Sequence, residues 1–173
     1  MSGEACRIRP LTEDELPLIL TWRNDPAVRS VMFTSHEINL DEHRHWFARA
    51  SQDPFRRLLL VEDADAPIGY VQLTNVKEGG ISDWGFYVAP TAPRGTGRRL
   101  GQAALHHAFG TLGLHKLCGQ ALSTNTPSIR LHEALGFVQE GLLRHQHRSR
   151  NEYLDVICFG LLASEWSRLT KEE

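Results

Sequence analysis

The sequence is poor in the features that would assign its class at once. Only three cysteines, Cys6, Cys118 and Cys158, occur in 173 residues, and such a scattered, odd set does not predict a disulfide framework. Buried free thiols in a reducing compartment are the simplest interpretation. No apolar run approaches the length of a membrane span, and the first residues lack the basic and apolar parts of a secretion signal. We therefore expect a cytoplasmic protein with no membrane partner.

An excess of charge of one sign is also missing. The chain has 19 Lys and Arg against 21 Asp and Glu, a net charge of −2, so nothing global indicates a nucleic-acid partner. Two His-x-His pairs occur, at 43–45 and 145–147, but no cysteine or acid completes a zinc spacing, and we expect no metal. The length and a hydrophobic content of 41% fit one globular domain, 1–173.

Hydrophobic periodicity predicts strands mixed with helices. Strands are expected at 6–11, 57–62, 68–76, 81–88, 117–122, 137–143 and 153–162, and helices at 12–24, at 27–32, from a cap at 39 or 41, and after 97. The last two strands are expected to close as an antiparallel pair around a basic loop, 144–150. We predict an α/β domain of three layers, with a mixed, mostly antiparallel central sheet flanked by helices.

The segment from Trp84 to Leu100 is the most informative. An apolar run ends at Val88, a bend with prolines follows, and the run from Arg94 to Gly97 leads into an apolar stripe at helical spacing. Glycines at a strand-to-helix turn let the backbone approach a ligand closely. The unpaired amides and the dipole at the helix start suit a phosphate. Arg94, Arg98 and Arg99 add positive charge at this place. The pattern predicts a pyrophosphate site.

Two familiar phosphate loops fit this segment badly. A P-loop needs Gly-Lys-Ser/Thr at the helix start, where this chain has Gly97-Arg98-Arg99. A dinucleotide-binding loop follows the first strand of its fold and has an acid about 20 residues further on, which is absent at 115–118. An ordinary glycine-rich loop that caps a helix stays open as an alternative.

Two motifs in this half of the chain resemble those of the GNAT N-acetyltransferases. The coenzyme A motif Gln/Arg-x-x-Gly-x-Gly/Ala is met by Arg94 and Gly97, with Arg99 in place of the last glycine. Residues 125–137 resemble Asn-x-x-Ala-Ile-x-Leu-Tyr-Glu-Lys-Leu-Gly-Phe, with His132 at the tyrosine position. The resemblance implies the GNAT fold and an acetyl-CoA-dependent N-acetyltransferase, with acetyl-CoA as co-substrate.

The resemblance also implies where the cofactor lies. In the family, the strand before the phosphate loop splays from its neighbour, and its exposed backbone groups hold the pantetheine arm and the thioester oxygen. These roles would fall on Phe86, Tyr87 and Val88. The cofactor-binding residues implied in this way are Phe86, Val88, Arg94, Gly95, Thr96, Gly97, Arg98, Arg99, Asn125 and Arg130.

Acetyl transfer from a thioester needs a free amine, a donor for the carbonyl oxygen and a proton for the departing thiolate. We hypothesise that His132 is the general acid, because it occupies the position of the family tyrosine. The alternatives are that His132 only fills space beside the cofactor and that Tyr87 has taken the acid role. The base stays open among His36, Glu37, His43, Asp83 and a chain of water molecules.

The N-terminal half resembles the acetyltransferases of pseudaminic acid biosynthesis in the segments 21–26, 31–32 and 38–46, and the match continues in short pieces to 156. It implies an acceptor in the form of a UDP-linked 4-amino-4,6-dideoxy sugar, acetylated on its 4-amino group for flagellin glycosylation. The substrate-binding residues implied are Arg23, Met32, His43, Thr74, Asn75 and Tyr87. Arg23 would hold the pyrophosphate, His43 would donate to a phosphate or ribose oxygen, and Met32 and Tyr87 would sandwich the uracil.

Each of these residues also has a structural interpretation. Arg23 could pair with Asp25, Met32 could fill the core, and His43 could be an exposed helix residue. Two other functions compete with sugar acetylation. One is acetylation of a protein N-terminus, as in the ribosomal-protein acetyltransferases, and the other is a non-catalytic coenzyme A binding module. Homodimerisation stays open.

Overall fold

The structure is a computed structural model that describes residues 6–171. One seven-stranded sheet runs through it in the order β1-β2-β3-β4-β5-β7-β6. The strands are β1 (Arg7–Pro10), β2 (Arg57–Asp63), β3 (Ala66–Thr74), β4 (Ile81–Val88), β5 (Lys116–Leu122), β6 (Val138–Ser149) and β7 (Glu152–Leu162). The helices are α1 (Leu16–Asn24), α2 (Pro26–Arg29), α3 (Leu40–Ala50), α4 (Thr96–Leu105), α5 (Thr126–Ala134) and α6 (Ala163–Leu169), with a short 3-10 helix η1 (Glu13–Glu15) and a π-helix η2 (His106–Thr111).

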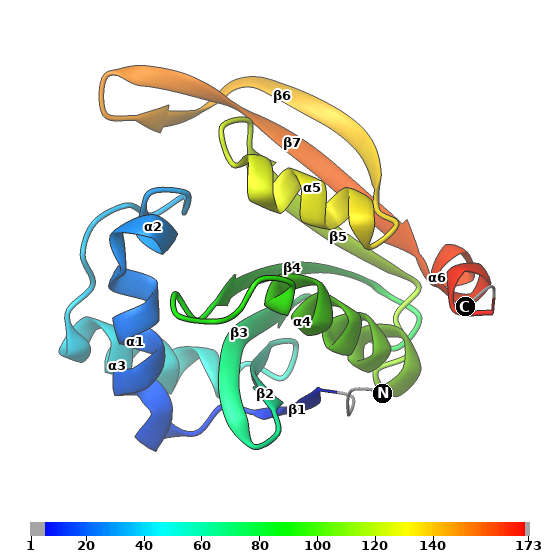
Figure 1. The fold of residues 1–173 in the computed structure, drawn as a ribbon, viewed down its shortest axis with the longest axis horizontal. Helices are drawn as coiled ribbons and strands as arrows, with labels where there is room; N and C mark the ends of the chain where they lie inside the picture. The colour runs from blue at the N-terminus through cyan, green and yellow to red at the C-terminus, as the bar shows by residue number, and fades with distance from the viewer. Residues whose placement is uncertain (1–5, 172–173) are drawn as a thin grey trace.

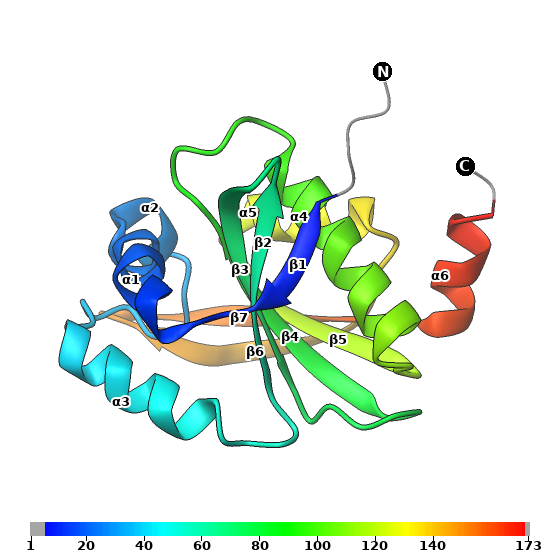
Figure 2. The same cartoon turned by 90° about the horizontal axis from the view of Figure 1, so that it is seen from below.

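Helices cover both faces of the sheet, as Figures 1 and 2 show. The pair α4 and α5 lies on one face, while α1 and α3 lie against the strands of the N-terminal half on the other face. All neighbouring strands are antiparallel except β4 and β5, which are parallel. The predicted three-layer architecture with a mixed, mostly antiparallel sheet is confirmed.

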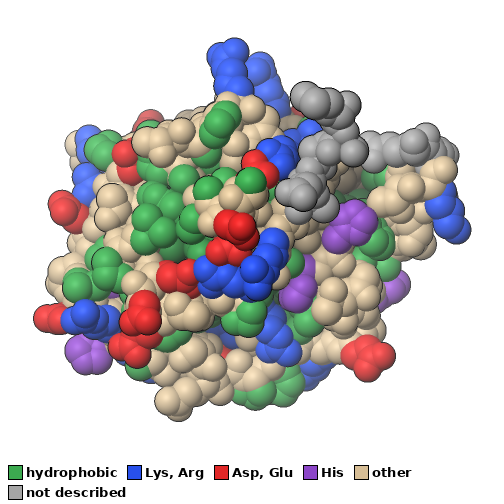
Figure 3. Space-filling view, turned by 60° about the horizontal axis from the view of Figure 1, so that its bottom comes forward, with side chains coloured by type: hydrophobic (Ala, Val, Ile, Leu, Met, Phe, Trp, Pro, Cys, Tyr) green, Lys and Arg blue, Asp and Glu red, His purple; other side chains and the backbone are tan. Residues whose placement is uncertain are grey.

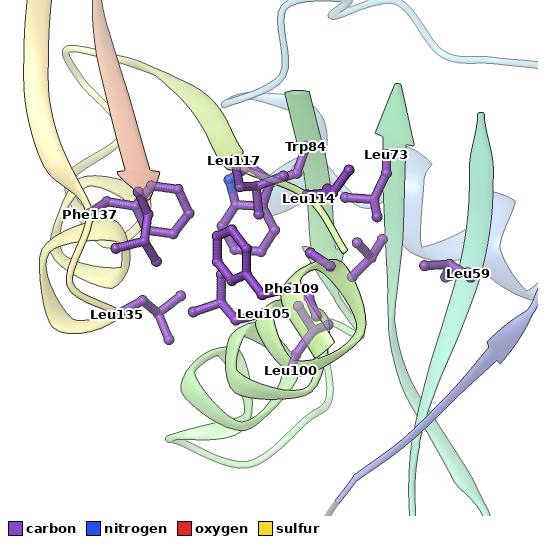
Figure 4. Packing of buried hydrophobic residues seen from close by; sticks show 14 of the residues in the cluster. Leu59, Leu73, Trp84, Leu100, Leu105, Phe109, Leu114, Leu117, Leu135 and Phe137 are labelled. Atoms are coloured by element: carbon purple, nitrogen blue, oxygen red, sulfur yellow. The ribbon is translucent and has the colours of Figure 1, made fainter. Parts of the chain in front are cut away.

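Two apolar cores follow from this layering. The larger lies between the sheet and α4 and includes Leu100, Leu117 and Phe137, which Figure 4 shows packed together with Trp84. Of the predicted helical stripe at 100, 104, 108 and 112, the first three residues are fully buried in this core, and Leu112 packs against it half-buried. The smaller core joins α1 and α3 to the other face of β2, β3 and β4. Because both cores include β4, this strand is fixed from both sides.

Local signals explain where several elements begin and end. The side chain of Asn39 accepts a hydrogen bond from the amide of Glu42 at 2.9 Å, which confirms the predicted cap of α3. Helix α1 ends at Asn24 because Asp25 caps the short helix α2, which begins with Pro26. The predicted single helix at 12–24 is divided into the turn η1 and α1.

Strands β4 and β5 are paired only at their first residues. Ile81, Ser82 and Asp83 lie opposite Lys116, Leu117 and Cys118, and no further pair follows in the described chain. Beyond residue 83, β4 continues to pair with β3 while β5 pairs with β7. The sheet therefore opens into a V between its two halves.

The basic segment 144–150 is not the loop that the sequence predicts. Residues 144–149 belong to β6, which continues to Ser149, so that the hairpin turn falls at residues 150–151. The register is irregular between Leu143 and His147, and His145 has a left-handed φ of 50°. A bulge of this kind keeps a polar, irregular segment within a strand, which explains why the sequence pattern suggests a loop.

The surface in Figure 3 shows acidic, basic and hydrophobic side chains side by side over its described part. This mixture agrees with the net charge of −2. Among residues 6–171, no helix combines the length and apolar character needed to cross a lipid bilayer.

Candidate active site

The V between β4 and β5 contains a cavity of about 780 Å³. One wall is the run from Trp84 to Val88 and the opposite wall is the run from Cys118 to Leu122. The N-terminal turns of α4 and α5 line one part of the cavity, which we call the phosphate end. Residues of α2 and its following loop line another part, which we call the acceptor end. The splayed strand that the sequence resemblance implies is therefore present, and Phe86, Tyr87 and Val88 all line the cavity.

The α4 end of the cavity has the properties of a phosphate site. Helix α4 has Gly95 as its N-cap, and neither a capping side-chain bond nor an acid occurs in its described first turn. Gly95 has a φ of 88°, a conformation that glycine adopts without strain. Within the described chain, no hydrogen bond uses the amides of Gly95 and Gly97, and both residues line the cavity. Uncapped amides at a helix start favour an anion.

The predicted arginines divide between the cavity and the surface. Arg98 lines the cavity, whereas Arg94 and Arg130 are exposed and lie outside its wall. Arg99 forms a two-pronged ion pair with Asp63 at the end of β2, with one N–O distance of 2.6 Å. The expected phosphate contact of the Arg99 side chain is thus not supported, because its guanidinium is committed to a carboxylate outside the cavity.

Thr96 and Asn125 shape the two helix starts. The buried Thr96 hydroxyl donates to the carbonyl of Pro93 at 2.7 Å and closes the turn before α4. Asn125 lines the cavity and caps α5, because its side-chain oxygen accepts from the amide of Ser128 at 3.2 Å. Both residues therefore fix the backbone around the phosphate end.

His132 is enclosed on all sides, although it borders the cavity. Its side chain is 1% exposed, and its Nε2 accepts from Trp84 Nε1 at 3.1 Å. An indole N–H can only donate, so the imidazole proton is on Nδ1, which donates to the carbonyl of Ser128 at 2.8 Å. Burial lowers the pKa of His132 below the usual value for histidine. This arrangement argues against His132 as general acid, because its one proton is already donated.

The hydroxyl of Tyr87 is also directed away from the cavity. It lies 3.5 Å from the carbonyl of Ile19 in α1, and its ring packs on Tyr70 with centroids 5.1 Å apart. Burial raises the pKa of Tyr87 well above the usual value for tyrosine. The phenol stays neutral, and its proton points toward α1.

Arg23 and His43 are not in the wall of the cavity. Both are more than nine-tenths buried, and Arg23 donates to the carbonyl of Thr34. Arg23 Nη1 and His43 Nε2 are buried with no hydrogen-bond partner in the described chain. Burial lowers the pKa of both side chains, and the nearby guanidinium lowers that of His43 further. Neither structural interpretation of these residues holds, because Arg23 does not pair with Asp25 and His43 is not exposed.

One carboxylate belongs to the cavity wall. Asp83 lines it near the point where β4 and β5 separate, and its Oδ2 accepts from Asn75 Nδ2 at 3.2 Å. Thr74, which pairs with Asp83 across β3 and β4, is not in the wall. Of the four candidate bases, Asp83 alone lines the cavity: Glu37 pairs with Arg29, and His36 with Glu42, on the surface. Within residues 6–171, no three potential metal ligands gather.

Sequence reasoning missed two parts of this site. Phe33 lines the acceptor end directly after Met32, the predicted residue that does line it. Trp84, Gly119 and His132 line the cavity together, and we call this part of the wall the floor. A Cβ atom on Gly119 would lie only 2.6 Å from the indole nitrogen of Trp84, so no larger residue fits at 119 without a shift of its neighbours. An aromatic residue directly after Met32 was a usable signal in the sequence, whereas a single glycine at 119 gave none.

Comparisons with known proteins agree with this geometry. A family model described as acetyltransferase (GNAT) domain matches residues 6–138. Spermidine N(1)-acetyltransferase of Vibrio cholerae is 28% identical over 92% of this chain and 94% of its own length. Acetyltransferase PseH of Campylobacter jejuni is 26% identical over 71% of this chain and 76% of its own.

A solved structure extends the similarity to three dimensions. The spermidine N-acetyltransferase of Vibrio cholerae in complex with CoA and spermine has a TM-score of 0.87 at 27% identity, over 95% of this chain and 99% of its own. The predicted GNAT fold is confirmed. The chain therefore belongs to the GNAT acetyltransferases, and it is an enzyme that transfers the acetyl group of acetyl-CoA to an amine.

Proposed function

We propose that this acetyltransferase acts on the 4-amino group of a UDP-linked 4-amino-4,6-dideoxy sugar. The observation that carries the proposal is the make-up of the acceptor end of the cavity. Its α2 side is apolar throughout, formed by Ala27, Val28, Val31, Met32 and Phe33. Among the described residues of the wall, Asp83 is the one carboxylate. The apolar α2 side suits the flat uracil ring of such an acceptor, and a single carboxylate suits its single amine.

The same composition disfavours a polyamine. A polyamine keeps further positive charges after one amine has entered the site, and each of these needs a carboxylate or water nearby. Among its described residues the wall offers one carboxylate. The guanidinium of Arg23 is buried outside the wall, within electrostatic range of Tyr87, which lines it. A positive charge placed there would repel a second ammonium group, whereas it would attract a phosphate.

The unpartnered nitrogens of Arg23 and His43 support a phosphate-bearing acceptor. Leaving a buried polar nitrogen without a partner costs about 1–3 kcal/mol, so such groups are usually met by a water, an ion or a ligand. We propose that these two nitrogens face the acceptor's phosphates, as the resemblance implies. Contact would require the loop that carries Thr34, the present partner of Arg23, to move.

The proposed mechanism is direct attack of the amine on the thioester that bound acetyl-CoA supplies. Asp83, oriented by Asn75, accepts the proton of the acceptor ammonium and frees the amine. Backbone amides at Gly95 and Gly97 hold the diphosphate, and the free edge of β4 holds the pantetheine arm. His132 fixes the indole of Trp84 in the floor and donates no proton to substrate. After attack, the nitrogen gives its second proton to solvent as the carbon–sulfur bond breaks. A thiol has a reference pKa of about 8.5, so the departing sulfur can take its proton from solvent.

A second candidate function is polyamine acetylation. It is favoured by the overall similarity to the spermidine N-acetyltransferase structure, which contains spermine. Acetylation of a protein N-terminus stays a third alternative. A non-catalytic module is not supported, because the relatives are acetyltransferases. The cytoplasm stays the proposed location, since all three cysteines are free.

A thiol-release assay with acetyl-CoA separates these functions. The enzyme is offered a UDP-4-amino-4,6-dideoxy sugar, spermidine, or a peptide with a free N-terminus. We expect the nucleotide sugar to give the highest kcat/KM. If spermidine or the peptide alone accelerates thiol release, the sugar proposal is wrong. Asp83→Asn should abolish most of the activity, while Asp14→Asn, an exposed acid on η1, should leave it unchanged.

A further inference from the structure

The acceptor end of the cavity is bordered by an aromatic contact between distant parts of the chain. Phe33 lines the cavity although its side chain is 45% exposed. Its ring meets the imidazole of His147 edge-on, with centroids 5.4 Å apart. The contact joins the loop after α2 to the β6–β7 hairpin, and Figure 1 shows this hairpin extending over the α2 side of the molecule.

The bulge in β6 explains why the hairpin reaches this position. His145 adopts a left-handed φ, and its amide donates to the carboxylate of Asp155 in β7 at 2.8 Å. The carbonyl of Asp155 in turn accepts from the amide of Ser123, directly after β5, at 2.9 Å. Bulges bend a strand and increase its twist. The hairpin is therefore bent at 144–146. Next to this bend, the hydrogen bond between Ser123 and Asp155 connects it to the end of β5, which lines the cavity.

We infer that Phe33 and the His147 ring that packs on it determine acceptor specificity. Phe33 lines the acceptor end, and His147 lies outside that lining, against the ring of Phe33. Two rings at right angles form an aromatic corner, and such a corner favours a flat ring in the distal part of the acceptor. The apolar α2 wall continues directly into this corner through Met32. The inference rests on acetyl transfer in this cavity, and it holds for any amine that is turned over there.

The matched pair Phe33→Leu and Phe55→Leu tests this inference. Phe55 is exposed to the same degree, at 46%, but is not in the cavity wall. With the amine that is turned over best, Phe33→Leu should raise the acceptor KM about three- to tenfold, the effect of one lost aromatic contact. The KM for acetyl-CoA and kcat should stay within about twofold of wild type, and Phe55→Leu should change none of the three constants.

An unchanged acceptor KM in Phe33→Leu would overturn the inference, as would an equal rise in Phe55→Leu or in the KM for acetyl-CoA. These variants do not test the sugar proposal. That proposal is tested by which amine the wild-type enzyme acetylates. His147→Leu should reproduce the effect from the opposite side of the corner, and His147→Phe, which keeps a ring there, should restore wild-type KM.

A second pair of variants tests the position of the hairpin. Asp155→Ala removes the acceptor of the His145 amide, while Asp155→Asn keeps an oxygen that can accept the same hydrogen bond. We expect Asp155→Ala to raise the acceptor KM at least threefold and Asp155→Asn to stay near wild type. A wild-type acceptor KM in a folded Asp155→Ala enzyme would show that the bend does not place the specificity wall.

Discussion

Replacement of His132 by phenylalanine distinguishes a catalytic from a positioning role for this side chain. Phenylalanine keeps a flat ring that can stack on Phe159, whose ring centroid lies 4.6 Å from that of His132. It removes both hydrogen bonds, and the indole N–H of Trp84 is left buried without an acceptor. A buried donor without a partner costs about 1–3 kcal/mol. For a protein of this size, the melting temperature should fall by about 2–12 °C.

The effect on turnover should be small. Loss of a general acid typically lowers kcat by about 10²- to 10⁴-fold. His132 donates its one proton to the carbonyl of Ser128, and burial lowers its pKa, so the cationic form is scarce at neutral pH. We therefore expect kcat of His132→Phe to fall less than tenfold, and the wild-type pH–rate profile to show no decline through a histidine pKa.

Thiol release at saturating acetyl-CoA and acceptor, measured across neutral pH, gives kcat for both enzymes. Phe159→Leu is the control, because it thins the same aromatic stack and touches neither hydrogen bond. A hundredfold loss of kcat in a His132→Phe enzyme that melts like Phe159→Leu would refute the reasoning. It would restore the hypothesis that His132 protonates the leaving sulfur.

Four further predictions concern the floor, the phosphate end, the base and the pH dependence of stability. Gly119→Ala should destabilise the fold by about 1–3 kcal/mol in chemical denaturation, because the added methyl group would overlap the indole–imidazole hydrogen bond above it. Gly95→Ala should cost about 1–2 kcal/mol for its left-handed φ, and calorimetry should show weaker binding of CoA. Asp83→Asn should lower kcat about 10²- to 10⁴-fold, and a near-normal rate would exclude it as the base. The free energy of unfolding should decrease as the pH falls below about 6.5, because the unfolded chain then binds more protons than the folded chain does. A melting temperature that rises on acidification would contradict this prediction. The side chains responsible are His43, His107 and His132, whose pKa values are lowered mainly by burial.

The phosphate end of the site was predictable because its signals are local. A strand, a bend, two glycines and an apolar helical stripe lie within 30 consecutive residues, and each acts through its own backbone or its near neighbours. The structure places Gly95 and Gly97 at an uncapped helix start beside the cavity. Capping by Asn39 and the break at Pro26 were predictable for the same reason.

The partners of individual side chains were not predictable, because they come from distant segments. Arg99 follows the glycines of the motif, yet Asp63 on another strand holds its guanidinium. His132 occupies the place of a family tyrosine, yet Trp84 lies 48 residues earlier and fixes its tautomer. The basic run at 144–150 is polar enough for a loop, and only pairing with β7 makes it a strand.

The short parallel pairing of β4 with β5 has a mechanical consequence. The two halves of the sheet share main-chain pairing over only three residues on each strand, so few hydrogen bonds hold one half to the other. A molecule bound between β4 and β5 and hydrogen-bonded to both would stabilise the two halves relative to each other. Acetyl-CoA at a hundred times its Kd would add about 2.7 kcal/mol to stability by mass action. Main-chain amides of β4 beyond residue 83 should then exchange with deuterium far more slowly than in the free enzyme.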